Sequence, residues 1–259
     1  GNLSRQVNPD QVPYSYGEMY QADAFYPNLP VLLDAPYILR DFRGQNIIVK
    51  PFAYNHVSKT LRVFHDMDIV VEKTNGEAIN PKSTRKSKQI KVDSEMRGYY
   101  QRHFINFGQG ATKYNFVEDR GEMLVICTDT YAEAMQPLVN WKNQSGRPTT
   151  LVKLSEIGGN NEAQIKGYIQ DRYLSGNLEF VLLVGDYDDL TPHYIGDGYS
   201  DCWFGQLEGN DNYIEVFVGR FSAESITDVQ NQVNKVIYYE RDLDANQHWL
   251  GKGVGIGST

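Results

Sequence analysis

The second half of the chain alternates between apolar strands and amphipathic helices, and this alternation constrains the fold more than any other feature. Continuous apolar runs predict strands at residues 123–128, 149–154, 180–184 and 214–218, with one more beginning at 254–257. Apolar residues spaced three and four apart predict helices at residues 131–145, 161–174 and 222–241. Because the strands are apolar runs rather than alternating patterns, they indicate a parallel sheet covered on both faces. The predicted class is α/β, doubly wound and mainly parallel, with ligands beyond the carboxyl ends of the strands.

Residues 1 to about 110 show a different pattern, in which short strands alternate with frequent turns. Apolar residues recur with a period of two at 60–65 and 67–72, and this pattern predicts an all-β sandwich. A glycine-rich break at residues 108–110 precedes the change of pattern. We therefore place the boundary after Lys113, which gives a first domain of residues 1–113 and a second of residues 114–259.

The segment from residue 80 to residue 91 is polar and strongly basic. Its cationic residues are Lys82, Arg85, Lys86, Lys88 and Lys91. Such a charge run is typical of a solvated loop, and the alternative is a linker that is sensitive to proteases.

Three carboxylates lie at the ends of two neighbouring predicted strands. Asp186 follows the strand at 180–184, while Asp211 and Glu215 accompany the strand at 214–218. The spacing of Asp211, Tyr213 and Glu215 places alternate residues on one side of an extended segment. Carboxylate and carbonyl oxygens are the ligands that calcium prefers. On the residues alone, a substrate site, a metal site and solvated turns all remain open, and solvated turns are the simplest of the three.

Composition excludes several classes of function. The chain has 259 residues and a net charge of −8, from 33 acidic and 25 basic residues, which argues against nucleic acid as a partner. We find no apolar stretch long enough to span a membrane. Cys127 lies inside an apolar run and is expected to be buried, and we treat Cys202 as structural because no histidine is nearby in sequence.

Several segments together resemble the gingipain family of cysteine peptidases, and most closely its arginine-specific members. In the second half these segments are residues 114–118, 139–146, 180–186, 209–222, 238–241 and 249–251. Residues 32–72, which include Arg40-Asp41-Phe42-Arg43, resemble the propeptide of the same family more loosely.

The resemblance implies a zymogen, in which a β-sandwich propeptide precedes a caspase-like catalytic domain. Such peptidases cut after arginine or lysine with a Cys/His pair, whose histidine lies in a Gly-His-Gly segment. This chain has no His-Gly step, so we expect the catalytic residues beyond Thr259 and none within the chain. We therefore expect the catalytic domain to be incomplete at its C-terminus, and this chain alone to be inactive.

The expected partners are protein or peptide substrates and the C-terminal catalytic segment of the same gene, which nicking could make a separate chain. The expected location is outside the cell or on its surface, associated with a bacterial outer membrane. No signal peptide is present, and we expect any signal to have been removed before Gly1.

The resemblance also implies a structural Ca²⁺ ion and a processing site. The calcium ligands would be the carboxylates of Asp186, Asp211 and Glu215, with backbone carbonyls from Glu208 and Tyr213. Processing would separate Lys113 from Tyr114. Propeptides of this kind often block the catalytic cleft with a basic side chain. Arg97 or Arg102 could do so, although a surface role is the simpler interpretation for both.

Two other classes of function compete with the peptidase. A catalytically inactive relative could keep the scaffold and calcium site as a surface or secretion-linked binding protein. The residues after Thr259 would discriminate, because a peptidase needs the Gly-His-Gly segment and a later cysteine. A doubly wound nucleotide binder is weaker, because the chain has no GxGxxG segment or phosphate-binding loop of the required spacing.

Overall fold

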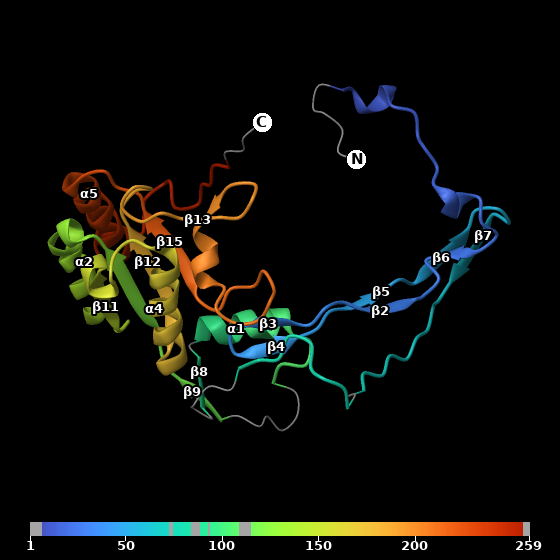
Figure 1. Cartoon of the computed structure of the whole chain (residues 1–259), viewed down its shortest axis with the longest axis horizontal. Helices are drawn as coiled ribbons and strands as arrows, with labels where there is room; N and C mark the ends of the chain where they lie inside the picture. Colours follow the sequence, from blue (N-terminus) through green and yellow to red (C-terminus); the bar gives the residue numbers. More distant parts are fainter. Residues whose placement is uncertain (1–6, 73–74, 84–88, 93, 109–114, 256–259) are drawn as a thin grey trace. The chain divides into compact units, whose positions relative to one another are not determined.

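The computed structural model describes residues 7–72, 75–83, 89–92, 94–108 and 115–255 (Figure 1). The chain forms two compact units, of which the first comprises residues 1–36 and 45–79 and the second comprises residues 37–44 and 80–259. In the described residues, no helix is both long enough and apolar enough to cross a membrane. The β-rich N-terminal region and the parallel α/β region that follows it confirm the predicted fold class.

The first unit is built from short antiparallel strands. Strands β1 (Phe25–Tyr26), β6 (Phe52–Asn55) and β7 (Thr60–Val63) form one sheet, and β2 (Val31–Leu33) pairs with β5 (Ile47–Val49). Short 3₁₀ turns at Pro9–Gln11 and Glu18–Tyr20 precede them. The strand predicted at 67–72 does not form, and Val70 is 77% exposed. Period-two alternation alone does not make a strand, because a strand also needs a neighbour to bond its backbone.

The second unit begins with a hairpin of β3 (Tyr37–Leu39) and β4 (Phe42–Gly44). Strand β8 (Gln89–Val92) pairs in parallel with β9 (Asn115–Glu118), and helix α1 (Ser94–His103) follows β8. Helix α1 corrects the all-β prediction for the first 110 residues. Its Met96 and Tyr100, four positions apart, are buried in a cluster with side chains of β3.

The α/β body is organised around a sheet of four described strands, all parallel, in the order β11-β10-β12-β15. These are β10 (Glu122–Cys127), β11 (Thr149–Lys153), β12 (Leu178–Val184) and β15 (Phe217–Phe221). The first three confirm the predicted strands. The fourth begins at Phe217 instead of residue 214, because Glu215 N donates to Gly205 O, at the end of a preceding 3₁₀ helix, rather than to β12. The strand predicted from 254 is not formed at residues 254–255, and 256–257 lie outside the described residues.

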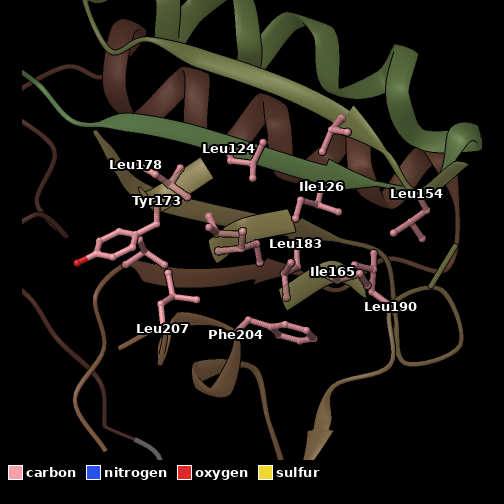
Figure 2. Packing of buried hydrophobic residues seen from close by; sticks show 14 residues of the cluster. Leu124, Ile126, Leu154, Ile165, Tyr173, Leu178, Leu183, Leu190, Phe204 and Leu207 are labelled. Atoms are coloured by element: carbon pink, nitrogen blue, oxygen red, sulfur yellow. The ribbon is translucent and has the colours of Figure 1, made fainter. Parts of the chain in front are cut away.

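Helices cover both faces of this sheet, as its apolar strands predicted (Figure 1). Helices α2 (Ala132–Gln144) and α5 (Ile226–Ile237) pack on one face, with Met135, Leu138 and Val229 fully buried there. Helix α4 (Glu162–Ser175) packs on the other face, and the short α3 (Leu154–Ile157) follows β11. Figure 2 shows the hydrophobic core on the α4 face of the sheet, in which Ile165 of α4 and Phe204 pack with Leu183 of β12.

Shorter elements connect these layers. A 3₁₀ turn at Asp129–Tyr131 leads into α2, and a π turn at Tyr238–Asp242 ends α5. A small hairpin of β13 (His193–Tyr194) and β14 (Tyr199–Ser200) precedes the 3₁₀ helix η4 (Asp201–Gly205) between β12 and β15. The strand order reverses between β10 and β12, so the carboxyl ends of these two strands form the topological switch point.

Helix α5 begins at Ile226, after an N-cap at Ser225, rather than at the predicted residue 222. Ser225 Oγ accepts from Asp228 N at 3.2 Å, while Ser222 lies before the helix and donates to Asp186. We expect Ser225→Ala to lower the free energy of unfolding by about 1 kcal/mol, because an orphan backbone donor loses its acceptor. Urea unfolding followed by circular dichroism measures this loss. Ser222→Ala is the matched control, and an equal or larger loss there would contradict the assigned cap.

Candidate functional site

The loop from Leu207 to Val216 carries four of the five residues predicted to bind calcium. Both ends of the loop are anchored, because Leu207 and Val216 are buried in the core beneath the sheet. Glu215 Oε2 accepts from Leu207 N at 2.7 Å and from Glu208 N at 2.9 Å, so its carboxylate closes the loop on itself. Gly209 has a φ of +78°, where other residues would be strained.

Asp211 is held by donors from two directions. Its Oδ1 accepts from Tyr213 N at 2.9 Å within the loop. Its Oδ2 accepts from Ile38 N at 2.8 Å and from Asn80 Nδ2 at 2.7 Å. Asn80 also accepts from Asn210 N at 2.9 Å, so residues far earlier in the chain help to shape the loop.

Glu208 faces a second set of partners. Its Oε1 accepts from Lys82 Nζ at 3.0 Å and from the Tyr173 hydroxyl at 2.8 Å, and its Oε2 accepts from Ser83 N at 2.9 Å. The Glu208 side chain is buried, and its charge is balanced by the ion pair with Lys82. Lys82 belongs to the segment that was predicted to be a solvated basic loop. Lys82 is only 19% exposed in its side chain, so it departs from that prediction, while residues 84–88 lie outside the described part.

One carboxylate oxygen of the Leu207–Val216 loop has no hydrogen-bond partner. Glu215 is 2% exposed, and its Oε1 is buried without a hydrogen bond. Burial raises the pKa of Glu215 to about 7; the charges of Asp211 and Glu208 add to this shift, and the two backbone N–H donors oppose it. A buried carboxylate oxygen without a donor is costly, and a bound cation would remove that cost.

Four of the five predicted calcium ligands lie in the Leu207–Val216 loop. The carboxylates of Asp211 and Glu215 and the carbonyls of Glu208 and Tyr213 belong to one short loop, and all are oxygen donors. Within the described ranges, no group of three His, Cys, Asp or Glu side chains is placed so that it could hold a metal. Backbone carbonyls would therefore have to complete any metal site in this loop.

Asp186 is not brought to this loop. The register pairs Phe180 with Phe217 and Val184 with Phe221, so Glu215 precedes one end of this ladder and Asp186 follows the other. The four strand steps between these pairs alone measure about 13 Å. Ligands of one calcium ion lie within about 5 Å of each other. Asp186 therefore does not share one ion with Glu215 in this structure, which the sequence spacing alone did not reveal.

Asp186 instead belongs to a polar network at the carboxyl edge of the sheet. Its Oδ1 accepts from Ser222 Oγ at 2.9 Å. Arg220 binds both carboxylate oxygens of Asp201, at 2.7 and 2.8 Å, and donates to Gly185 O at 2.9 Å. Gly185 has a φ of +132°, and a side chain at this position would collide with Asp189. These contacts fix the turn after β12.

The sequence analysis missed Arg40, which is a buried cation at the tip of the β3–β4 hairpin. Its Nη1 donates to Leu178 O at 2.6 Å and to Glu215 O at 3.0 Å, and its Nη2 donates to Asn177 Oδ1 at 3.1 Å. The residue is 3% exposed, whereas Arg97 is half-buried and Arg102 is exposed. No sequence signal separates Arg40 from other arginines, since the acceptors of its Nη atoms lie more than 130 positions away.

The two cysteines differ sharply in environment. Cys127 is fully buried at the end of β10, as predicted, and burial raises the pKa of its thiol to about 12. A thiol that stays protonated is a poor nucleophile. Cys202 is exposed in η4.

Comparison with known proteins identifies the family. A model of Peptidase family C25 matches residues 117–259, more than half of the chain, and the model Propeptide_C25 matches residues 1–107. The chain belongs to peptidase family C25. The resemblance to gingipains is thereby confirmed. In this C25 chain, the propeptide match includes Arg40, Asn80 and Lys82. Their hydrogen-bond partners fall in the peptidase match: Asn177 and Glu215 for Arg40, Asp211 for Asn80 and Glu208 for Lys82.

Curated relatives agree with this assignment. Gingipain R2 of Porphyromonas gingivalis (strain ATCC BAA-308 / W83) is 38% identical over 264 residues, covering 100% of this chain and 35% of the relative. Lys-gingipain HG66 of Porphyromonas gingivalis is 23% identical over 271 residues, covering 100% of this chain and 15% of the relative. The structure titled "Complex of Porphyromonas gingivalis RgpB pro- and mature domains" shares 38% identity, covers 51% of this chain and 32% of that chain, and has a TM-score of 0.49. The C25 chain spans about a third or less of its relatives' length.

The predicted processing site lies outside the described residues. Lys113 and Tyr114 belong to the segment 109–114, which the structure does not describe and which lies between the two family matches. The domain boundary after Lys113 therefore stays a prediction. The compact units divide the chain elsewhere, because the C25 propeptide contributes residues 37–44 and 80–107 to the same unit as the peptidase part.

Proposed function

We propose that this chain is the zymogen portion of a secreted or cell-surface cysteine endopeptidase that cleaves proteins or peptides after basic residues. Its membership of family C25, with propeptide and peptidase parts in one chain, is the observation that carries the proposal. The catalytic cysteine and histidine would lie beyond Thr259, in a C-terminal segment that is the partner of this chain. Arginine is the favoured target, because identity to gingipain R2 is 38% and identity to Lys-gingipain HG66 is 23%.

The experiment uses the full-length protein with its C-terminal segment. We expect hydrolysis of arginyl peptide substrates with a kcat/KM at least tenfold above that for lysyl substrates, and loss of activity after alkylation of the catalytic thiol. Sequencing of the mature N-terminus should find Tyr114. Absence of peptide hydrolysis by the processed protein would contradict the proposal and favour an inactive binding protein.

We also propose that the Leu207–Val216 loop binds a structural calcium ion through Glu208, Asp211, Tyr213 and Glu215. The support is the unpartnered, buried Oε1 of Glu215 within a loop of oxygen donors. The ion would neutralise two carboxylates and tie the start of the loop to its end. Because Glu215 lies two residues before β15, such an ion would stiffen the approach to this strand without entering the chemistry of peptide hydrolysis.

A further inference from the structure

The geometry points to an arginine-binding site on the peptidase part, at the amino end of β12, which the prosegment fills with Arg40. Here the prosegment denotes residues 1–107, which match the family propeptide. We propose that this site determines how long the prosegment stays bound after the chain has been cut between the two family matches. The inference rests on the proposed zymogen only for that cleavage.

The site consists of three acceptors on the peptidase part to which Arg40 of the prosegment donates. Leu178 O and Glu215 O are backbone carbonyls at the amino ends of neighbouring strands, and Asn177 adds its side-chain oxygen. Three hydrogen bonds from one guanidinium fill this set, and Asn177 is itself 7% exposed. The planar guanidinium of arginine carries several donors and can bond acceptors on three different residues at once, whereas the compact ammonium of lysine does not match this arrangement.

The hairpin that delivers Arg40 is strained in a way that favours a functional role. The register pairs Leu39 with Phe42, so Arg40 and Asp41 form a two-residue turn. Arg40 has a φ of +47°, a conformation for which such turns normally use glycine, asparagine or aspartate. A bulky residue persists there only when its surroundings compensate for the strain. Here the compensation comes from the buried hydrogen bonds of its guanidinium.

The charge of Arg40 is balanced within the prosegment. Asp41 Oδ2 lies 3.5 Å from Arg40 Nε and accepts from the Tyr100 hydroxyl at 2.6 Å. The hairpin therefore carries a cation together with its own counterion. The peptidase part needs to supply only neutral acceptors. The counterion that offsets the desolvation cost of the buried Arg40 charge comes from Asp41 of the prosegment itself.

A second contact ties the same hairpin to the peptidase part. Lys82 donates both to Arg40 O and to Glu208 Oε1, and the Tyr173 hydroxyl lies 3.0 Å from Arg40 O. Arg40 is thus held at its side chain and at its backbone. The chemical class that fits this site is a peptide turn carrying an arginine, with a second cation beside it.

The test uses the full-length protein with a recognition sequence for an added, site-specific protease placed within residues 109–114. Cleavage then does not depend on the protein's own activity, so failure of the proposed peptidase function and failure of this inference are distinguishable. After cutting, size-exclusion chromatography over time measures how fast the prosegment dissociates. We expect Arg40→Met to dissociate at least tenfold faster than the unsubstituted protein, and Arg40→Lys to be intermediate.

Arg43→Met is the matched control, because Arg43 lies in the same hairpin but is exposed. We expect it to change the dissociation rate by less than threefold. Asn177→Asp tests the other side of the site: its amide Nδ2 is buried without a partner, and a carboxylate would replace it with a charged acceptor for Arg40. Dissociation should then slow at least threefold. Unchanged or faster dissociation in Asn177→Asp, or wild-type dissociation in Arg40→Met, would overturn the inference, and Asn177→Asp decides if Arg40→Met does not fold.

Discussion

Replacing Phe204 by alanine is expected to lower the free energy of unfolding by about 3–5 kcal/mol. Phe204 is fully buried in the core between the sheet and α4, where its ring also contacts Trp203 (Figure 2). Removing the ring loses its transfer from water and leaves a cavity beneath the sheet. Because η4 leads directly into the Leu207–Val216 loop, the same change should loosen the candidate calcium site.

Phe217→Ala is the matched control, since it deletes the same ring from β15 at a position that is 40% exposed. Its stacking on Phe180 should make the loss measurable but no more than about 1.5 kcal/mol. Urea unfolding of both variants, followed by fluorescence and circular dichroism, gives the comparison. A loss below about 1 kcal/mol for Phe204→Ala would mean that the loop between β12 and β15 is not packed as described.

The α/β body could be predicted from sequence because its signals are local. Each strand of the sheet is an apolar run, and each covering helix shows apolar spacing of three and four. The helix α1 also carried such a signal in Met96 and Tyr100, but the surrounding pattern of short strands obscured it. The start of β15 was misplaced because residues 214–216 have a strand-like sequence, but Glu215 N bonds to Gly205 at the end of η4.

The candidate site was predictable only in part, because its remaining members depend on tertiary structure. Asp211, Tyr213 and Glu215 lie close in sequence, and alternation placed them together. Asp186 was predicted as a ligand from the family resemblance, but the strand register, which sequence spacing does not contain, separates it from the loop. Arg40 could not be found at all, since a buried cation at a hairpin tip has no local signature.

The prosegment holds the Leu207–Val216 loop by hydrogen bonds to two of its carboxylates. Asn80, Lys82 and the backbone of Ile38 supply donors to Asp211 and Glu208. Together with the backbone N–H groups of the loop itself and the Tyr173 hydroxyl, these contacts satisfy every carboxylate oxygen of the loop except Glu215 Oε1. Substitution of Glu215 therefore distinguishes a calcium site from a loop that is held by hydrogen bonds alone.

Calcium is expected to raise the free energy of unfolding of the full-length protein by about 2.7 kcal/mol at an ion concentration 100-fold above Kd. Glu215→Gln should remove most of this gain, because it replaces a charged ligand by a neutral amide. Thermal melting with calcium, with magnesium and with a chelator measures the shift. Glu133→Gln, an exposed substitution on α2, is the matched control and should keep the full calcium response.

In chelator the order of stability should reverse. Burial raises the pKa of Glu215, so above that pKa the ionised carboxylate destabilises the folded state relative to the unfolded chain. The neutral amide of Glu215→Gln avoids this cost and can still accept from the N–H groups of Leu207 and Glu208. At pH 8 the variant should therefore be at least as stable as the unsubstituted protein in chelator, yet less stable in calcium. If calcium raised the free energy of unfolding equally in Glu215→Gln and in the unsubstituted protein, the loop would be held together by its hydrogen bonds alone. The free-energy cost of burying Glu215 Oε1 without a partner would then remain uncompensated.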